Sequence, residues 1–446
     1  MPSPGPPSVQ CAPNWIPWAR CVGSERKNLM WTLLQRRPLR AYLAYRTLAL
    51  TWAFAPFQVY YLQRLGLSVS DVFDLNVVFC VAAVAFEVPT GMIADRYGRR
   101  IAMSAGGFAM SLACAFFIMG RSFGAFAVAN VLCALSMSLS SGADSAYLYD
   151  HLTNERQVAQ YSHWEGWSTA AKGVGNLVAV LLGALVYQYI HPAAVFVLTA
   201  FTTSVAGFVA LALPERRASH EGHVGDHLRR ALHTLRTDAR LTSIVAFGAV
   251  AFVLLRLSLF ADQPHLESHL QGAWLERTVL SMGLLAAAKE VGTALVASSA
   301  GTILARVRSR TIAVSLAAGL TVAYLLMGEA HGVVCTVLMV LLASAFGIFS
   351  PLMRALMNRL IGGSRDRATL LSFEGMGRRL LFAAMSPIFG RAVEGSSLHA
   401  TFAGTAWVAT ATFALLGVTA WVAFRPATSL SPVPRSAGSA AVSLAG

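Results

Sequence analysis

Two long apolar runs flank the stretch Gly91-Met92-Ile93-Ala94-Asp95-Arg96-Tyr97-Gly98-Arg99-Arg100. An Asp followed by three Arg cannot lie in hydrocarbon at that density, because each charge in a bilayer is costly. The stretch therefore predicts a tight turn at a membrane surface. We expect Gly91 and Gly98 to permit backbone conformations in this turn that a Cβ would forbid.

The composition indicates a polytopic membrane protein. Of 446 residues, 56% are hydrophobic and 13% are charged, and the mean hydropathy is +0.57. A soluble protein carries about twice that charged fraction. The net charge of +14 does not indicate nucleic-acid binding, because the basic residues fall in alternate loops, as the positive-inside rule predicts for a membrane protein.

The apolar runs predict twelve spans of about 20 residues, each long enough to cross a bilayer. The first six are expected at roughly 43–63, 72–93, 101–119, 123–147, 164–189 and 192–213. The second six are expected at roughly 241–261, 276–303, 311–329, 332–357, 368–390 and 398–424. The predicted divisions are a cytoplasmic arm (1–40), a six-helix half (41–213), a cytoplasmic connector (214–240), a second six-helix half (241–425) and a disordered tail (426–446).

The basic residues also predict the orientation of the spans. With the N-terminus inside, most of the 35 Lys and Arg fall in cytoplasmic segments. The outer loops then hold only Arg64, Arg121, Arg277 and Arg391. Omitting one helix would invert every later loop, so this asymmetry supports twelve spans with both termini in the cytoplasm.

The pattern G-x-x-x-D-R-x-G-R-R between two spans resembles the loop between helices 2 and 3 of the major facilitator superfamily. The stretch Gly301–Arg310 is a degenerate second copy: it keeps the Gly and places Arg306 and Arg310 in register with Arg96 and Arg100, with Ala305 in place of the Asp. Such a repeat indicates internal duplication. The resemblance implies an all-α membrane protein of twelve helices in two pseudo-symmetric halves.

The resemblance also implies a gate. In the superfamily this loop closes the inner side together with neighbouring helix ends, a role that would fall to Asp95, Arg96 and Arg100. The segment 140–150, which ends in Leu-Tyr-Asp, resembles a subgroup of bacterial facilitator permeases. It offers Asp144 or Asp150 as an acidic partner. The expected gating residues are Gly91, Asp95, Arg96, Gly98, Arg99, Arg100, Asp144, Asp150, Arg306 and Arg310.

Ionisable residues inside the spans are unevenly distributed. Spans 3, 6, 9 and 12 carry none in their interiors. Because a charge in the bilayer centre costs several kcal/mol, the residues in the other spans must face protein or water. The candidates for contact with a substrate or coupling ion are Glu87, Lys172, Arg256, Lys289, Glu290, Glu374, Arg378 and Arg379.

Each candidate has a structural alternative. Glu374 and Arg378 are four residues apart on a helix, a spacing that favours an ion pair. Glu87 either carries a proton or pairs with a cation. Lys289 and Glu290 are adjacent and point about 100° apart, so they do not simply neutralise each other. Lys172 and Lys289 contact the substrate or coupling ion, or they pair between the halves. Arg256 has no acid three or four residues away and needs a partner elsewhere, a phosphate or carboxylate of a substrate, or bulk water.

The leading interpretation is a secondary transporter that works by alternating access around a midplane site. Resemblance to the permease subgroup implies proton-coupled export of an amphipathic drug or metabolite by a monomer in the bacterial inner membrane. The chain departs from the usual drug exporters, since span 4 has no embedded Arg and span 5 has no Gly-Pro pair.

Two alternatives remain open. Lys172, Arg256, Lys289, Arg378 and Arg379 outnumber the acids in the spans, which favours uptake or exchange of a small anionic metabolite. A non-transporting sensor would need an added signalling domain. An enzyme is not expected, because the sequence shows no nucleotide-binding loop, no metal-ligand spacing and no nucleophile with an evident base. No cofactor, metal or nucleic acid is implied.

Overall fold

A computed structural model describes residues 37–215, 238–269, 278–330, 332–361 and 367–423. Their regular secondary structure is entirely helical. The predicted arm at 1–40 (apart from its last residues), most of the connector, and the tail lie outside the described residues.

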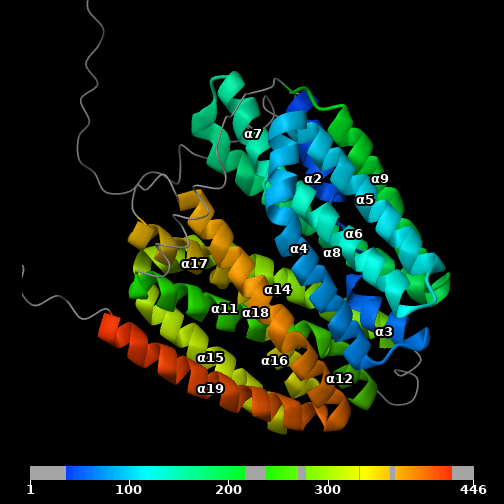
Figure 1. The fold of residues 1–446 in the computed structure, drawn as a ribbon. Coiled ribbons are helices and arrows are strands. Elements are labelled where there is room, and N and C mark those ends of the chain that lie inside the picture. Colours follow the sequence, from blue (N-terminus) through cyan, green and yellow to red (C-terminus); the bar gives the residue numbers. More distant parts are fainter. Residues whose placement is uncertain (1–36, 216–237, 270–277, 331, 362–366, 424–446) are drawn as a thin grey trace, which may run out of the picture.

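The first bundle contains the helices up to residue 211 (Figure 1). In chain order they are α2 (Arg37–Leu48), the 3-10 turn η1 (Ala55–Phe57), α3 (Gln58–Arg64), α4 (Val69–Tyr97), α5 (Arg99–Met119), α6 (Phe123–Ser140), α7 (Ala143–Asn154), the 3-10 turn η2 (Val158–Gln160), α8 (Tyr161–Tyr189) and α9 (Ala194–Leu211).

The second bundle contains the helices from residue 239 onward (Figure 1). They are α11 (Ala239–Phe260), α12 (Asp262–His269), α14 (Thr278–Arg306), α15 (Ser309–Glu329), α16 (Gly332–Ser344), α17 (Phe346–Ile361), α18 (Arg367–Gly395) and α19 (Leu398–Ala423).

Ten stretches of the described chain are helical, long and apolar enough to cross a membrane; α6 with α7 and α16 with α17 each count as one. The expected span at 43–63 is not a single helix: α2 ends at Leu48, and the chain turns before η1, where a Pro lies in the first turn. The expected span at 368–390 is a continuous helix, α18. It is not among the ten, because Glu374, Arg378 and Arg379 interrupt its apolar sequence.

Aromatic side chains fill the core of each bundle. In the first, Phe54, Phe117 and Phe196 are buried and their rings lie 5.0–5.5 Å apart. In the second, Tyr324 is buried and donates to the Leu254 carbonyl at 2.6 Å. The four helices α5, α9, α15 and α19, which correspond to the spans predicted to be free of charge, expose large apolar side chains such as Leu112, Phe201, Val314 and Trp407. These surfaces suit contact with lipid.

The two bundles meet along two helix pairs, which we call the α4–α18 seam and the α8–α14 seam. At the start of α4, Ser70 donates both its amide and its hydroxyl to Glu394 of α18, at 2.8 and 2.5 Å. Nearby, the side chains of Gln63 and Gln263 hydrogen-bond across the bundles. Figure 1 shows the bundles meeting around α3 and α12 and diverging toward α7 and α17. We call these the Ser70 end and the Asp95 end.

The turn between α4 and α5 is tighter than the sequence suggested. Helix α4 continues through Pro89 to Tyr97, and α5 begins at Arg99. Gly98 alone makes the turn, with φ = 107°, a region that a Cβ disfavours. The expectation for Gly91 is wrong: Gly91 is helical, and a Cβ there would have no neighbour within 4 Å.

Candidate functional site

Glu87 joins the bundles at the α4–α18 seam. Its carboxylate accepts a hydrogen bond from the Ser372 hydroxyl at 2.8 Å and forms an ion pair with Arg379. All three side chains line a cavity of about 390 Å³ between α4, α6 and α18, which extends to Asp95 and Arg99. This volume is within the range of small-molecule pockets.

Arg378, the neighbour of Arg379, has a different environment. Its Nε lies 3.2 Å from a carboxylate oxygen of Glu374, one turn earlier on α18. This is the ion pair expected from the sequence. The guanidinium also lies 5.3 and 5.5 Å from the ring centres of Phe252 and Phe349, within the range of cation–π attraction. Arg378 is therefore held within the second bundle, whereas Arg379 reaches the first.

Arg256, on α11, is half-buried and lies 5.8 Å from the ring centre of Phe382 on α18. No carboxylate of the described chain lies within 4.0 Å of it. Its electrostatic neighbours are the cation Arg379 and the thiol of Cys80 on α4. It is a cation without a counter-charge beside the α4–α18 seam.

The α8–α14 seam holds two of the other candidates, Lys172 and Glu290. Asn176 of α8 donates to the Glu290 carboxylate at 2.7 Å. Lys172, one turn earlier on α8, lies in the field of Glu290 without a direct ion pair in the described residues. Lys289 is turned away from this seam and pairs with Asp262 at the start of α12, inside the second bundle. The adjacent Lys289 and Glu290 thus have separate partners, as their angular separation predicts.

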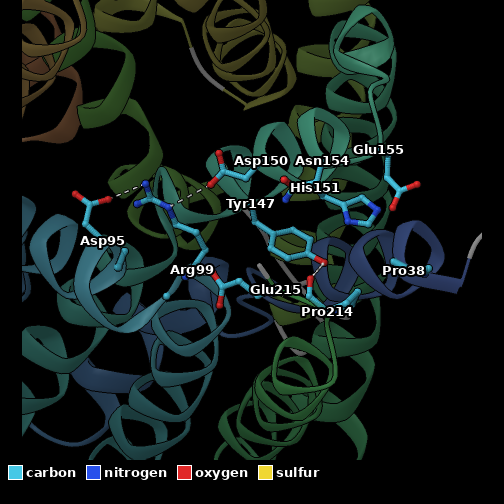
Figure 2. Close-up of a pocket in the computed structure, with 12 residues that line it drawn as sticks. Pro38, Asp95, Arg99, Tyr147, Asp150, His151, Asn154, Glu155, Pro214 and Glu215 are labelled. Carbon is cyan, nitrogen blue, oxygen red and sulfur yellow. Dashed lines mark hydrogen bonds and ion pairs between the residues drawn. The ribbon is translucent and has the colours of Figure 1, made fainter. Parts of the chain in front are cut away.

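The charges of the predicted gate bind one another within the first bundle (Figure 2). Arg99 lies 2.7 Å from Asp95 and 3.9 Å from Asp150. Glu215 accepts hydrogen bonds from the backbone N–H groups of Arg99 and Arg100, and its carboxylate lies 3.8 Å from the Arg100 guanidinium. A carboxylate at a helix N-terminus satisfies free N–H groups and opposes the helix dipole. Asp95, Arg99, Asp150 and Glu215 border a second cavity of about 330 Å³.

The two acidic alternatives for the gate differ. Asp150 does contact the motif, through Arg99. Asp144 does not: its carboxylate pairs with Arg46 of α2, and both side chains are buried. Helix α6 ends before Ser141, and Gly142, at φ = 85°, redirects the chain so that Asp144 lies in the first turn of α7.

The remaining motif arginines are exposed. Arg96 lies over the ring of Tyr97, at 5.6 Å from its centre. Arg306 and Arg310 flank the α14–α15 turn, and neither forms an ion pair with a described residue. Within the part of the chain that the structure describes, the second copy of the motif therefore lacks the charge pairs of the first.

Four partners were missed from the sequence: Arg46, Glu215, Asp262 and Ser372. Arg46 lies within a predicted span, and that alone was a signal that it needs an acid. Glu215 and Asp262 lie within two residues of the ends of predicted spans. A charge is expected at such a position, so it gives no sign that the residue has a partner inside the protein. Ser372 offered no signal.

Two helical bundles that meet at charged seams around an internal cavity define a polytopic membrane protein of the transporter class. The chain belongs to the major facilitator superfamily, whose family model matches residues 47–385. It is therefore a multi-pass transporter by family and not an enzyme. No curated protein matches it in sequence.

Solved structures share the fold. A mutant form of the nucleoside transporter NupG is 12% identical, with a TM-score of 0.71 over 87% of this chain and 99% of that one. The unaltered NupG has a TM-score of 0.69 at 12% identity, over 86% of this chain and 99% of that one. A bacterial homologue of the human lysosomal transporter Spinster, inward-facing and unoccupied, is 15% identical, with a TM-score of 0.60 over 90% of this chain and 97% of that one.

Proposed function

We propose that the chain is a secondary transporter that moves a small molecule by alternating access and couples this movement to protons at Glu87. The observation that carries the proposal is the position of Glu87, which lies on one bundle, pairs with Arg379 of the other and borders the 390 Å³ cavity. The charged carboxylate holds the bundles together at this point, and protonation releases it. The proton thereby shifts the population between arrangements of the bundles.

We further propose twelve spans, with α2, η1 and α3 as a broken first span and α18 as the eleventh. The asymmetry of Lys and Arg supports cytoplasmic termini and, with them, an Asp95 end that faces the cytoplasm. The halves are 41–213 and 241–425, joined by the connector 214–240, in a monomer of the plasma membrane. The bundles meet at the Ser70 end and diverge at the other (Figure 1), and the 390 Å³ cavity extends to Asp95; both observations support an arrangement open to the cytoplasm.

In this proposal the Asp95–Arg100 motif is a gate element in its released state. Its charges bind Asp150 and Glu215 of their own bundle. When the cytoplasmic side closes, some of these groups are expected to exchange partners with ends of α17 and α18. Arg306 and Arg310 would be the weaker counterpart on the second bundle.

Two substrate classes are candidates. The resemblance of segment 140–150 to bacterial permeases favours export of an amphipathic drug or metabolite. Arg256 is near the cavity-lining Arg379 and has no counter-charge among the described residues, which favours uptake or exchange of an anionic metabolite. Between the two, the geometry supports the anion, because an unpaired cation near the membrane centre is costly unless a ligand neutralises it.

The test is transport in inside-out and right-side-out vesicles under an imposed pH gradient, with cationic, neutral and anionic compounds. Accumulation in inside-out vesicles indicates export, and accumulation in right-side-out vesicles indicates uptake. We expect Glu87→Gln to abolish the effect of the pH gradient. The matched control is Glu394→Gln, which removes the other carboxylate that bridges α4 and α18, at the Ser70 end; its transport rate is expected to change with the opening of that end, but its response to the pH gradient should remain. Gradient-driven transport by Glu87→Gln at the wild-type rate would refute the coupling role.

A further inference from the structure

The described residues around the α4–α18 seam carry more cations than carboxylates. Glu374 pairs with Arg378, and Glu87 pairs with Arg379. Arg256 is left over, as is Arg354 of α17, whose side chain is exposed. An uncompensated cation at this depth costs several kcal/mol, whereas a bound anion would remove most of that cost. The charge balance therefore points to an anionic ligand.

The surroundings of Arg256 also suit an apolar group. Phe382 is buried beneath the guanidinium, and its ring centre lies 6.1 Å from those of both Phe252 and Phe260. The side chain of Arg256 is only partly buried. The guanidinium is thus accessible at the edge of an aromatic cluster, a setting that would hold an anionic head next to an apolar body.

We infer that Arg256 and Arg379 together bind the oxyanion head of an amphipathic organic anion, a carboxylate or a phosphate, and that this anion competes with Glu87 for Arg379. A guanidinium presents a planar fork of donors that matches either head group. The inference rests on the proposed function, since it assigns the substrate class of the same site.

The competition sets the sign of the coupling. With the site empty, Arg379 binds the charged Glu87 carboxylate. When the anion engages Arg379, Glu87 loses its counter-ion and takes up one proton from solution. Binding of the anion and of the proton therefore favour each other, by reciprocal linkage. The two are carried in the same direction, so an inward proton gradient drives uptake of the anion.

The other charges that face Glu87 leave this sign unchanged. From α18, Arg378 acts on Glu87 at longer range but is paired with Glu374. From α4 and α5, Asp95 and Arg99 line the same cavity and pair with each other. From α6 the cavity wall consists of the uncharged Ser138 and Leu139.

The experiment uses the purified full-length protein in lipid nanodiscs with benzoate, phenyl phosphate and benzylammonium as probes. Binding is followed by titration calorimetry, and proton uptake by a pH indicator in weakly buffered solution. We expect benzoate or phenyl phosphate to bind, more tightly as pH falls, with uptake of a proton, and benzylammonium not to bind. Which of the two anions binds separates carboxylate from phosphate as the head group.

The variants locate the site. Arg256→Gln is expected to weaken binding of the anion by at least roughly tenfold, a loss of about 1.4 kcal/mol. Arg256→Lys keeps the positive charge and serves as the second variant in case Arg256→Gln impairs folding. It should bind the anion with an affinity between those of the wild type and Arg256→Gln. The control is Arg354→Gln, an exposed span arginine on α17 without an ion pair in the described chain, which should bind like the wild type.

The outcomes separate this inference from the proposed function. Failure of both anions to bind the wild type at millimolar concentration, or unaltered affinity in both Arg256 variants, would overturn the inference and leave proton coupling at Glu87 standing. Glu87→Gln should bind the anion at all pH values without proton uptake. If that variant still takes up a proton on binding, the assignment of the proton to Glu87 fails, whereas an anion site at Arg256 stands.

Discussion

The ammonium of Lys289 on α14 binds the carboxylate of Asp262 at the first position of α12, and the side chains are only 6% and 18% exposed. Gln263, the next residue, hydrogen-bonds to Gln63 of the other bundle. The Lys289–Asp262 pair therefore fixes the start of α12, and with it the position of Gln263, which joins the two bundles at the Ser70 end. Lys289 holds structure there, and it is not free to bind a substrate in this arrangement.

Removing one partner should destabilise the second bundle. Lys289→Ala leaves the Asp262 carboxylate buried without a counter-ion, and we expect a loss of roughly 3–5 kcal/mol of stability. Thermal unfolding of the detergent-solubilised protein, followed by size-exclusion chromatography, measures it. The double variant Asp262→Asn with Lys289→Met removes both charges and should recover most of the loss. A double variant no more stable than Lys289→Ala would contradict the ion-pair explanation.

The two acids considered for the gate should differ in their effect on stability. Asp144→Asn leaves the buried Arg46 unpaired, which should cost about 3–5 kcal/mol. Asp150→Asn removes a partly exposed contact of 3.9 Å to Arg99 and should cost less than about 1 kcal/mol. The same thermal assay compares them. If Asp144→Asn loses no more stability than the small loss expected for Asp150→Asn, the Arg46–Asp144 pair does not support the bundle.

The two glycines of the motif should respond in opposite directions to alanine. Gly98→Ala forces a Cβ into a conformation at φ = 107° and against the Glu215 carboxylate, so we expect a loss of about 1–2 kcal/mol. Gly91→Ala adds a Cβ to a helix at an open position and should stabilise by about 0.5–1 kcal/mol. Thermal unfolding of both variants tests this. Destabilisation by Gly91→Ala would show that Gly91 is needed for closer packing in another arrangement.

The fold could be predicted from the sequence where the signal is local. Hydropathy located ten helical stretches that are long and apolar enough to cross a membrane. The break within 43–63 followed from Pro56 and the turn before it, which an average over twenty residues does not detect. The Glu374–Arg378 pair was predicted because helix geometry alone brings residues four apart together.

Partners far apart in the chain could not be predicted in this way. Glu87 and Arg379 are 292 positions apart, and only the packing of α4 against α18 brings them together. The sequence shows that each charge in a span needs a partner, but it does not show which residue that partner is. Asp262 was missed for the same reason, since a residue just past a predicted span end looks solvated until α12 turns it toward Lys289.

The clasp between Ser70 and Glu394 should hold the Ser70 end shut. Glu394 accepts two hydrogen bonds from Ser70, whose amide lies in the first turn of α4. Deeper along the same seam, Asn76 donates to the buried Ser386 at 3.3 Å. Glu394→Gln weakens the charge-assisted bonds, and opening at this end should become roughly fivefold more frequent, for a loss of about 1 kcal/mol.

The measurement is the rate at which a membrane-impermeant maleimide modifies Ser386→Cys in a background without the native cysteines. Ser386 is fully buried here, so modification requires the Ser70 end to open. We expect the rate to rise in Glu394→Gln and to stay unchanged in Glu155→Gln, whose carboxylate lies at the Asp95 end (Figure 2). If Ser386→Cys reacts equally fast with and without Glu394, the seam is closed by its apolar contacts, such as the ring of Phe73 against Phe260 and Phe389, and the clasp only caps α4.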